Sequence, residues 1–210
     1  KDSKYLLFYI FNQNYNWTMK KLLILISVLA ILSCKEYPKV DYAIISGKIT
    51  NKEKGGVSIM SYDRSFEETL DISDEGTFVD TLDLEESSYV LYDGKNPVFL
   101  YLEPGDHLNI AYDAKDFDAS ISIKGKGSEI SKYLISKRKI EKELFGSAKE
   151  VYSLEEDEFK NKIREITEAQ EKLLIDSKGI PKDYKEKEKR NLNYFYLRLL
   201  IDYEDAHKEF

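Results

Sequence analysis

Short hydrophobic runs separated by turn residues fill the chain from residue 42 to residue 127. Apolar and polar positions alternate in several of these runs, so that Leu108, Ile110 and Tyr112, for example, share one face. Alternation with a period of two is typical of a strand with one buried face. The runs predict strands over residues 42–50, 57–62, 67–72, 77–82, 88–92, 98–102, 107–112 and 120–124. Short strands at a spacing of about ten residues favour an antiparallel β-sandwich or a barrel-like sheet.

Helical periodicity replaces this alternation in the last part of the chain. Ile130 and Tyr133 begin a loose apolar stripe that predicts a first helix over about residues 128–144. Ser153 followed by Glu156 has the pattern of a capping box, in which each side chain satisfies a free backbone N–H of the first turn. This pattern predicts the start of a second helix.

A third helix is predicted to follow Pro181, a residue that suits the first helical turn. Its residues 192–201 are apolar almost all round, so we expect them to be buried on more than one side. The pattern continues to Phe210 without a polar tail, and the helical segment 128–210 is interpreted as truncated at its C-terminus. The sequence therefore predicts an α+β protein, in which a β-rich domain over 42–127 precedes about three helices.

A different pattern precedes the β-rich domain. Met19 opens a stretch with two lysines and an uncharged apolar run over residues 22–32, and Ser33 then stands directly before Cys34. A basic region, an apolar run and a small residue at the cleavage point are the three parts of a secretory signal peptide. A helix of this length rises about 16 Å, roughly half a bilayer core, which argues against a stable membrane span. The alternative is a short buried helix that ends in a core cysteine.

The last four residues of this pattern, Ile-Leu-Ser-Cys at 31–34, resemble a lipobox, where signal peptidase II cuts before a cysteine that carries lipid. The resemblance implies that residues 19–33 are a lipoprotein signal peptide cleaved between Ser33 and Cys34. It also implies that acylated Cys34 binds membrane lipid and that residues 34–41 form a lipidated tether. Residues 1–18 contain no methionine and are interpreted as a non-native upstream segment, with a genuine longer leader as the alternative.

The charge balance limits the partners that we expect. The chain has a formal net charge of −7, and its acidic excess lies mostly between residues 35 and 127. Nucleic acids and anionic headgroups attract basic patches, so we expect no nucleic-acid binding. Cys34 is the single cysteine, and once acylated it leaves no free thiol, no disulfide and no CxxC motif. Thiol chemistry is therefore expected to reside elsewhere.

Motifs for catalysis or cofactor binding are weak. Gly125 and Gly127 lie between a strand and a helix, as in a dinucleotide-binding loop, but the third glycine is absent and the neighbouring strands are antiparallel. A turn with positive φ is expected there instead. His107 and His207 have no second metal ligand near them in the sequence. We expect no catalytic residue, no cofactor and no metal in this chain.

Two further groups of side chains are considered as binding sites. An acidic group lacks the glycine and the closing glutamate of a calcium loop and is interpreted as a solvated turn: Asp113, Asp116 and Asp118. A tyrosine group in the β-rich domain is interpreted mainly as core, with a ligand groove as the alternative: Tyr62, Tyr89, Tyr92, Tyr101 and Tyr112.

Several stretches resemble a known family in their order and spacing. They are Ile-Ser-Gly-Lys-Ile-Thr-Asn at 45–51, Asp-Glu-Gly-Thr-Phe at 74–78, Tyr-Leu-Glu-Pro-Gly-Asp-His-Leu-Asn-Ile at 101–110 and Ile-Lys-Gly-Lys-Gly-Ser-Glu-Ile-Ser-Lys-Tyr-Leu at 123–134. Together they resemble the N-terminal accessory region, a domain of unknown function, of TlpA-like thiol–disulfide oxidoreductase lipoproteins. In that family a C-terminal thioredoxin domain bears the WCxxC motif. This chain lacks that domain, so the resemblance carries over no catalytic residue.

The leading hypothesis is a non-catalytic N-terminal accessory region of a membrane-anchored thioredoxin-like thiol–disulfide oxidoreductase lipoprotein. The thioredoxin-like domain would be present in cis or as a protein partner. The alternative is a standalone cell-surface or periplasmic binding lipoprotein that captures a small ligand or a protein. Either function places the protein in the cell envelope, lipid-anchored. Lys35 and Glu36 resemble an export signal for the outer-membrane surface, whereas oxidoreductase function implies a periplasm-facing protein, and both locations stay open.

Overall fold

The structure is a computed structural model, and it describes residues 40–210. The predicted upstream segment, the signal peptide and most of the tether lie outside the described residues, and so do Ser33 and Cys34. The unit from Asp41 to Phe210 contains all the hydrophobic clusters discussed below.

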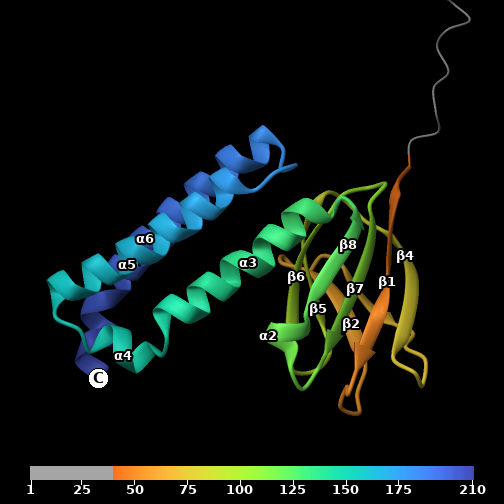
Figure 1. The fold of residues 1–210 in the computed structure, drawn as a ribbon, viewed down its shortest axis with the longest axis horizontal. Helices are drawn as coiled ribbons and strands as arrows, with labels where there is room; N and C mark the ends of the chain where they lie inside the picture. Colours follow the sequence, from red (N-terminus) through yellow and green to blue (C-terminus); the bar gives the residue numbers. More distant parts are fainter. Residues whose placement is uncertain (1–39) are drawn as a thin grey trace, which may run out of the picture. The chain divides into compact units, whose positions relative to one another are not determined.

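Eight strands occupy the first half of this unit, each within two residues of its predicted bounds. They are β1 (Tyr42–Thr50), β2 (Val57–Ser61), β3 (Glu67–Leu70), β4 (Thr77–Asp83), β5 (Ser87–Tyr92), β6 (Pro97–Leu102), β7 (His107–Asp113) and β8 (Ser122–Lys126). They form two four-stranded sheets, in the orders β4-β1-β7-β8 and β3-β2-β5-β6 (Figure 1). The predicted α+β class is confirmed.

The sheets are mostly antiparallel and are not closed. One pair departs from the predicted antiparallel arrangement: β1 runs parallel to β7, with Ile45 opposite Leu108. The prediction was wrong for this pair because alternation shows which face of a strand is buried and says nothing about the direction of its neighbour. Between β1 and β7 the chain forms β2 and β3 of the second sheet, then β4 of the first sheet, then β5 and β6 of the second sheet.

Side chains of both sheets meet in one hydrophobic core. Ile45 and Ile110 from the first sheet and Leu91 and Leu100 from the second are completely buried in it. The parallel pairing leaves no space at Gly47, where an added Cβ would lie 1.8 Å from the carbonyl oxygen of Ile110. Glycine is therefore required at this position of β1.

Five helices are present among residues 40–210, where about three were predicted. They are α2 (Phe117–Ser120), α3 (Ser128–Phe145), α4 (Ala148–Tyr152), α5 (Glu156–Asp176) and α6 (Lys182–Glu209). The long helices α3, α5 and α6 correspond to the predicted ones. The additional helices α2 and α4 have only four and five residues, too few to produce a recognisable periodicity.

The capping box lies earlier than predicted. Ser147 and Glu150 form it at the start of α4, with Ser147 Oγ accepting from the Glu150 N–H at 3.2 Å. Ser153 instead ends α4, and α5 begins after Glu155 without a side-chain cap. Both segments match the pattern Ser-x-x-Glu, so the pattern alone did not distinguish them.

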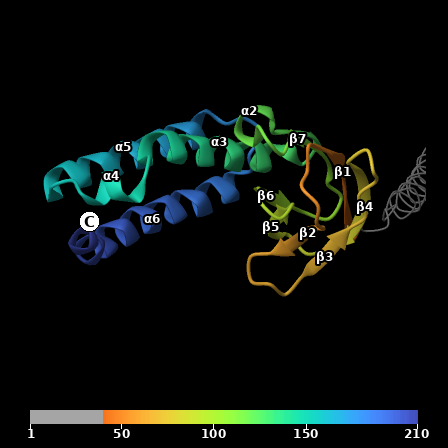
Figure 2. The same ribbon diagram turned by 90° about the horizontal axis from the view of Figure 1, so that it is seen from below.

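The helices α3, α5 and α6, here called the helical arm, lie side by side and lead away from the sheets (Figures 1 and 2). Two hydrophobic clusters hold the helical arm together, one around Tyr133 and Leu192 and one around Phe159. Residues 192–201 are not buried on several sides as predicted. Leu192 and Leu199 are buried, but the opposite side of α6 is exposed at Tyr194, Leu197 and Ile201.

Candidate functional site

The two longest stretches that carry the family resemblance meet at one place, here called the joint, where α3 follows β8. The backbone N–H of Tyr101 in β6 donates to Ser131 Oγ in α3 at 3.0 Å, and Ser131 Oγ donates to the Tyr101 carbonyl at 3.2 Å. Ser131 is completely buried. Lys126 Nζ donates to the Gly105 carbonyl at 2.8 Å. These contacts attach the start of the helical arm to the edge strand β6 and to the turn before β7.

Gly127 is the tightest position of the joint. Its φ of 81° is left-handed, as predicted for the strand-to-helix turn. An added Cβ would lie 1.9 Å from Asp106 Oδ1, so glycine leaves the space that this carboxylate occupies. Asp106 Oδ2 in turn accepts from the Glu103 N–H at 2.9 Å. The joint therefore depends on backbone geometry that other residues adopt only with strain.

A buried carboxylate ties α6 to α3 beside the joint. Glu188 of α6 is only 4% exposed, and its Oε1 lies 2.5 Å from Lys137 Nζ and 3.1 Å from the Tyr133 hydroxyl. Asn191 Nδ2 donates to the other oxygen at 3.1 Å. Burial raises the pKa of Tyr133, and the negative charge of Glu188 raises it further, so the hydroxyl remains a donor. The carboxylate is thus paired and hydrogen-bonded, the condition for placing a charge in a protein interior.

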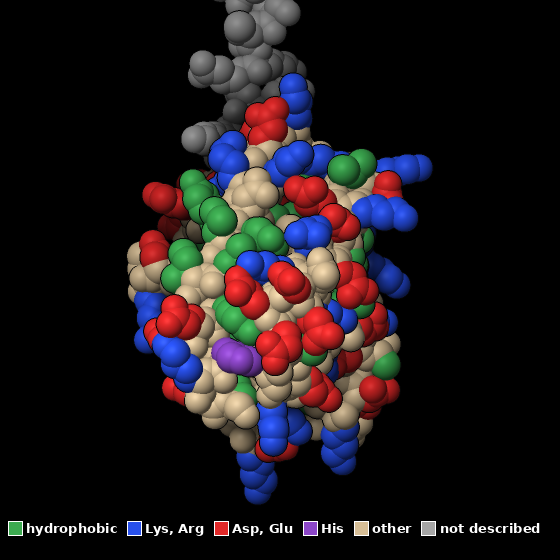
Figure 3. All heavy atoms as spheres, turned by 90° about the vertical axis from the view of Figure 1, so that its left-hand side faces the viewer, with side chains coloured by type: hydrophobic (Ala, Val, Ile, Leu, Met, Phe, Trp, Pro, Cys, Tyr) green, Lys and Arg blue, Asp and Glu red, His purple; other side chains and the backbone are tan. Residues whose placement is uncertain are grey.

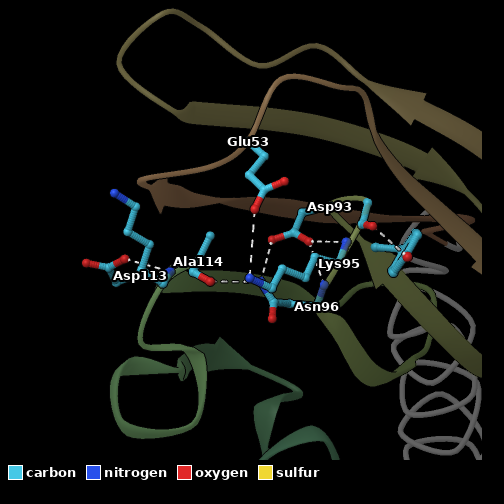
Figure 4. Close-up of polar contacts among 9 residues, drawn as sticks. Glu53, Asp93, Lys95, Asn96, Asp113 and Ala114 are labelled. Atoms are coloured by element: carbon cyan, nitrogen blue, oxygen red, sulfur yellow. Dashed lines mark hydrogen bonds and ion pairs between the residues drawn. The ribbon is translucent and has the colours of Figure 1, made fainter.

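The loops at one end of the two sheets line a polar hollow of about 70 Å³. Figure 4 shows the polar contacts of Asp93 and Asn96 at this place. Asp93, 5% exposed, accepts from the N–H groups of Lys95 and Asn96 at 2.9 and 2.6 Å and from the Tyr112 hydroxyl at 3.1 Å. Asn96 Nδ2 donates both to Asp93 Oδ2 at 3.1 Å and to the Ala114 carbonyl at 3.2 Å. Both oxygens of Asp93 are engaged, so this carboxylate fixes the loop between β5 and β6, ties it to Tyr112 of β7 and has little capacity left for a ligand.

Replacing Asp93 by asparagine is expected to destabilise the fold. The new amide nitrogen would face the donors of Asn96 or Tyr112, and an unsatisfied buried group costs about 1–3 kcal/mol. Burial raises the pKa of Asp93, but the hydrogen bonds from Asn96, Lys95 and Tyr112 together hold the pKa below its usual value. The stabilisation is therefore present above the unfolded-state pKa of about 3.9 and is lost as the pH falls through the lower folded-state pKa.

The measurement is urea unfolding of the unchanged protein and of Asp93→Asn at pH 7 and at pH 3. The difference between their free energies of unfolding should be smaller at pH 3. The exposed turn residue Asp74 is the matched control, because Asp74→Asn should change the free energy by less than about 0.5 kcal/mol. Equal effects of the two substitutions, or a gap that does not depend on pH, would contradict the role given to Asp93.

The tyrosine group does not form one ligand groove. Tyr89, Tyr101 and Tyr112 are buried, and their hydroxyls donate to a carbonyl or carboxylate of the chain itself. Only Tyr62 and Tyr92 lie at the surface. The interpretation of most of these residues as core is confirmed. The alternative of one groove lined by all five is wrong, because Tyr89 and Tyr112 lie in the core between the sheets, whereas Tyr101 lies in the cluster at the start of the helical arm.

A groove that the sequence did not reveal lies between α3 and the outer side of the second sheet. Tyr62 and Phe99 lie with ring centroids 6.1 Å apart, and the guanidinium carbon of Arg138 is 4.8 Å from the Phe99 centroid. Such a distance allows a cation–π attraction. The volume of about 150 Å³ is below the usual range of small-molecule sites, about 300–1,000 Å³. The three residues are far apart in sequence, and no motif connects them.

The histidines and the acidic group lie apart from one another. His107 is exposed on β7, whereas His207 near the end of α6 places Nδ1 2.6 Å from the Tyr152 carbonyl. Asp113 accepts from Asn51 Nδ2 at 2.7 Å, and Asp118 pairs with Lys142. Within residues 40–210, no three His, Cys, Asp or Glu side chains are grouped so that they can hold a metal ion.

At the C-terminal end of the helical arm, acidic and basic side chains alternate with small hydrophobic patches (Figure 3). In the part of the chain that the structure describes, no helix is both long and apolar enough to cross a membrane.

Comparison with protein-family models, with curated proteins and with solved structures finds no match to this chain.

Proposed function

We propose that this chain is the non-catalytic accessory region of a membrane-anchored thioredoxin-like thiol–disulfide oxidoreductase lipoprotein of the cell envelope. The observation that carries the proposal is the joint: the stretch with the most specific resemblance, 101–110, and the stretch 123–134 bind one another there. A structural dependence between these stretches explains why they occur together. We also interpret the two sheets as a β-sandwich, whose faces share one core.

The geometry of the joint favours a positioning role. The start of α3 is fixed by buried hydrogen bonds to β6, and the Glu188 contacts fix α6 to α3. A stiff connector sets the distance at which an attached domain works, whereas a flexible linker leaves it free. In this role the β domain follows the anchor at Cys34 along the chain, and the helical arm holds a thioredoxin-like domain, in cis or as a partner, away from the β domain.

The first test is the source gene beyond the codon for Phe210. The proposal expects a WCxxC motif in the continuation, or a thioredoxin-like protein that co-purifies with the lipoprotein. The complete assembly should reduce insulin disulfides, and residues 35–210 alone should not. A continuation without WCxxC, together with no thioredoxin-like partner in the purified protein, would overturn the proposal.

A glycine pair tests the positioning role in that assembly. Gly127→Ala places a Cβ against Asp106 at a positive φ, whereas Gly94→Ala has the same backbone sign, φ 95°, and open space around it. We expect Gly127→Ala to lower reduction of a protein disulfide and to leave reduction of a small aromatic disulfide unchanged. Gly94→Ala should leave both rates unchanged. Equal losses for the two substrates would indicate general damage to the redox domain and contradict a positioning role.

A further inference from the structure

The outer side of α6 carries an apolar stripe, defined as Tyr194, Leu197 and Ile201. Their exposed fractions are 66%, 51% and 77%. Residues at these spacings lie on one side of a helix. Leu192 and Leu199, which are buried in the helical arm, lie on the opposite side. The helix α6 therefore has two apolar sides, of which the helical arm uses one.

Single exposed hydrophobic residues are common on protein surfaces and need no partner. Here the three follow one another along two turns, with side chains large enough to interdigitate. This spacing is the one by which helices pack against a second helix. Burial of the α6 stripe against another apolar surface would be favourable.

The charged residues before and after the α6 stripe indicate which apolar surface would cover it. Before it, exposed cations outnumber exposed carboxylates, with Lys182, Lys187, Lys189 and Arg190 against Asp183 and Glu186. After it, carboxylates dominate, with Asp202, Glu204, Asp205 and Glu209 against Lys208. A second copy of α6 in the antiparallel direction would place each basic segment beside an acidic one. A parallel copy would place like charges together, which is unfavourable.

We propose that the α6 stripe is a dimerisation surface, on which two copies of this chain pair antiparallel about a two-fold axis near Leu197. In this arrangement Tyr194 of one copy packs beside Ile201 of the other, and Arg190 lies near Glu204 and Asp205 of the other. The same patch serves both copies, as a two-fold interface requires. The outer side of α6 is exposed from Asp183 to Asp205, so the helical arm leaves room for the second helix. Dimerisation does not depend on the proposed function.

The interface is small. The exposed side from Asp183 to Asp205 is about 33 Å long at 1.5 Å per residue, with three apolar side chains from each copy. An interface of this kind belongs to the low end of specific interfaces, where complexes are reversible. We therefore expect a monomer–dimer equilibrium that depends on protein concentration.

The experiment uses residues 35–210, which contain all three hydrophobic clusters. Sedimentation velocity from about 1 to 200 µM should show the dimer increasing with concentration. Ile201→Glu should weaken dimerisation by at least about tenfold, because it brings carboxylates into the apolar centre. The matched control is Ile175→Glu at the end of α5, 72% exposed and off the α6 stripe, which should not change it. Circular dichroism should show the same thermal unfolding for both variants.

A single introduced cysteine tests whether the two-fold axis of the dimer lies near Leu197. Residues 35–210 contain no cysteine, so Leu197→Cys introduces the only thiol. An oxidant such as diamide, which takes up two electrons and two protons, should join two copies through this position, since the axis brings the two Cα atoms within disulfide reach. Ile175→Cys should remain monomeric under the same conditions.

Charge reversal tests the antiparallel direction. Arg190→Glu should weaken the dimer, and adding Asp205→Arg should restore it. A protein that stays monomeric at every concentration and forms no Leu197→Cys disulfide would overturn the proposal, and this is the result expected if the α6 stripe instead binds a different protein. A dimer that the double reversal fails to restore would overturn the antiparallel arrangement.

Discussion

Replacing Cys34 by serine is expected to abolish lipid attachment completely. Serine lacks the thiol that receives the diacylglyceryl group, while Lys20, Lys21 and the apolar run remain able to engage the export machinery. A single acyl chain holds a protein at a membrane only marginally, and each further buried methylene adds about 0.8 kcal/mol. A diacylglyceryl group on sulfur together with an acylated amine would make attachment effectively permanent. If Cys34 is the lipid anchor, one atom of one side chain determines where the whole protein resides.

The measurement is growth of cells that express each protein with radiolabelled palmitate, followed by fractionation. The unchanged protein should take up label and sediment with membranes, and Cys34→Ser should remain unlabelled and uncleaved by signal peptidase II. Ser33→Ala is the matched control, because it keeps a small residue before the cleavage point and should still be labelled. Equal labelling of the unchanged protein and Cys34→Ser would contradict the anchor, and so would a mature chain that begins before Met19.

Most strands were predictable from the sequence because buried apolar positions alternate with polar ones and turn residues separate one strand from the next. β7 shows this clearly: Leu108, Ile110 and Tyr112 are buried, and His107 and Asn109 are exposed. The pairing of β1 with β7 was less accessible, since it joins residues about sixty positions apart. The parallel register of β1 with β7, and the close approach that requires Gly47, are part of this pairing.

The candidate site residues differ in the same way: some could be predicted from their neighbours in the sequence, and others depend on residues that are distant in the sequence. Gly127 was recognised as a turn residue from its place between a strand and a helix, and its left-handed φ follows from that place. The Asp93 cluster was not recognised, because Asp93, Tyr112 and Ala114 come together only through the fold. The burial of Glu188 was not predictable for a different reason. Residues 185–190 are all charged, and nothing in the sequence distinguishes Glu188 as the one whose side chain is buried.

Replacing Glu188 by alanine is expected to be among the most destabilising single changes in the helical arm, by about 3–5 kcal/mol. The substitution removes the acceptor for the Tyr133 hydroxyl and leaves the partly buried Lys137 ammonium without a counter-charge. Breaking one side of a buried ion pair costs more than the pair contributes, because the remaining charge stays desolvated. Since Glu188 links α6 to α3, the loss should loosen the helical arm while the β core remains folded.

Glu186→Ala is the matched control for this prediction. Glu186 lies two residues earlier on α6 and pairs with Lys182 at 3.7 Å, but both side chains are largely exposed, so its loss should cost less than about 1 kcal/mol. Urea unfolding followed by circular dichroism gives the free energies, and hydrogen exchange of the α6 amides locates the loosened segment. Combining Glu188→Ala with Lys137→Met should recover part of the loss, since it also removes the stranded charge. A cost for Glu188→Ala no larger than that for Glu186→Ala, or no recovery in the double variant, would show that the ion pair does not hold α6 against α3.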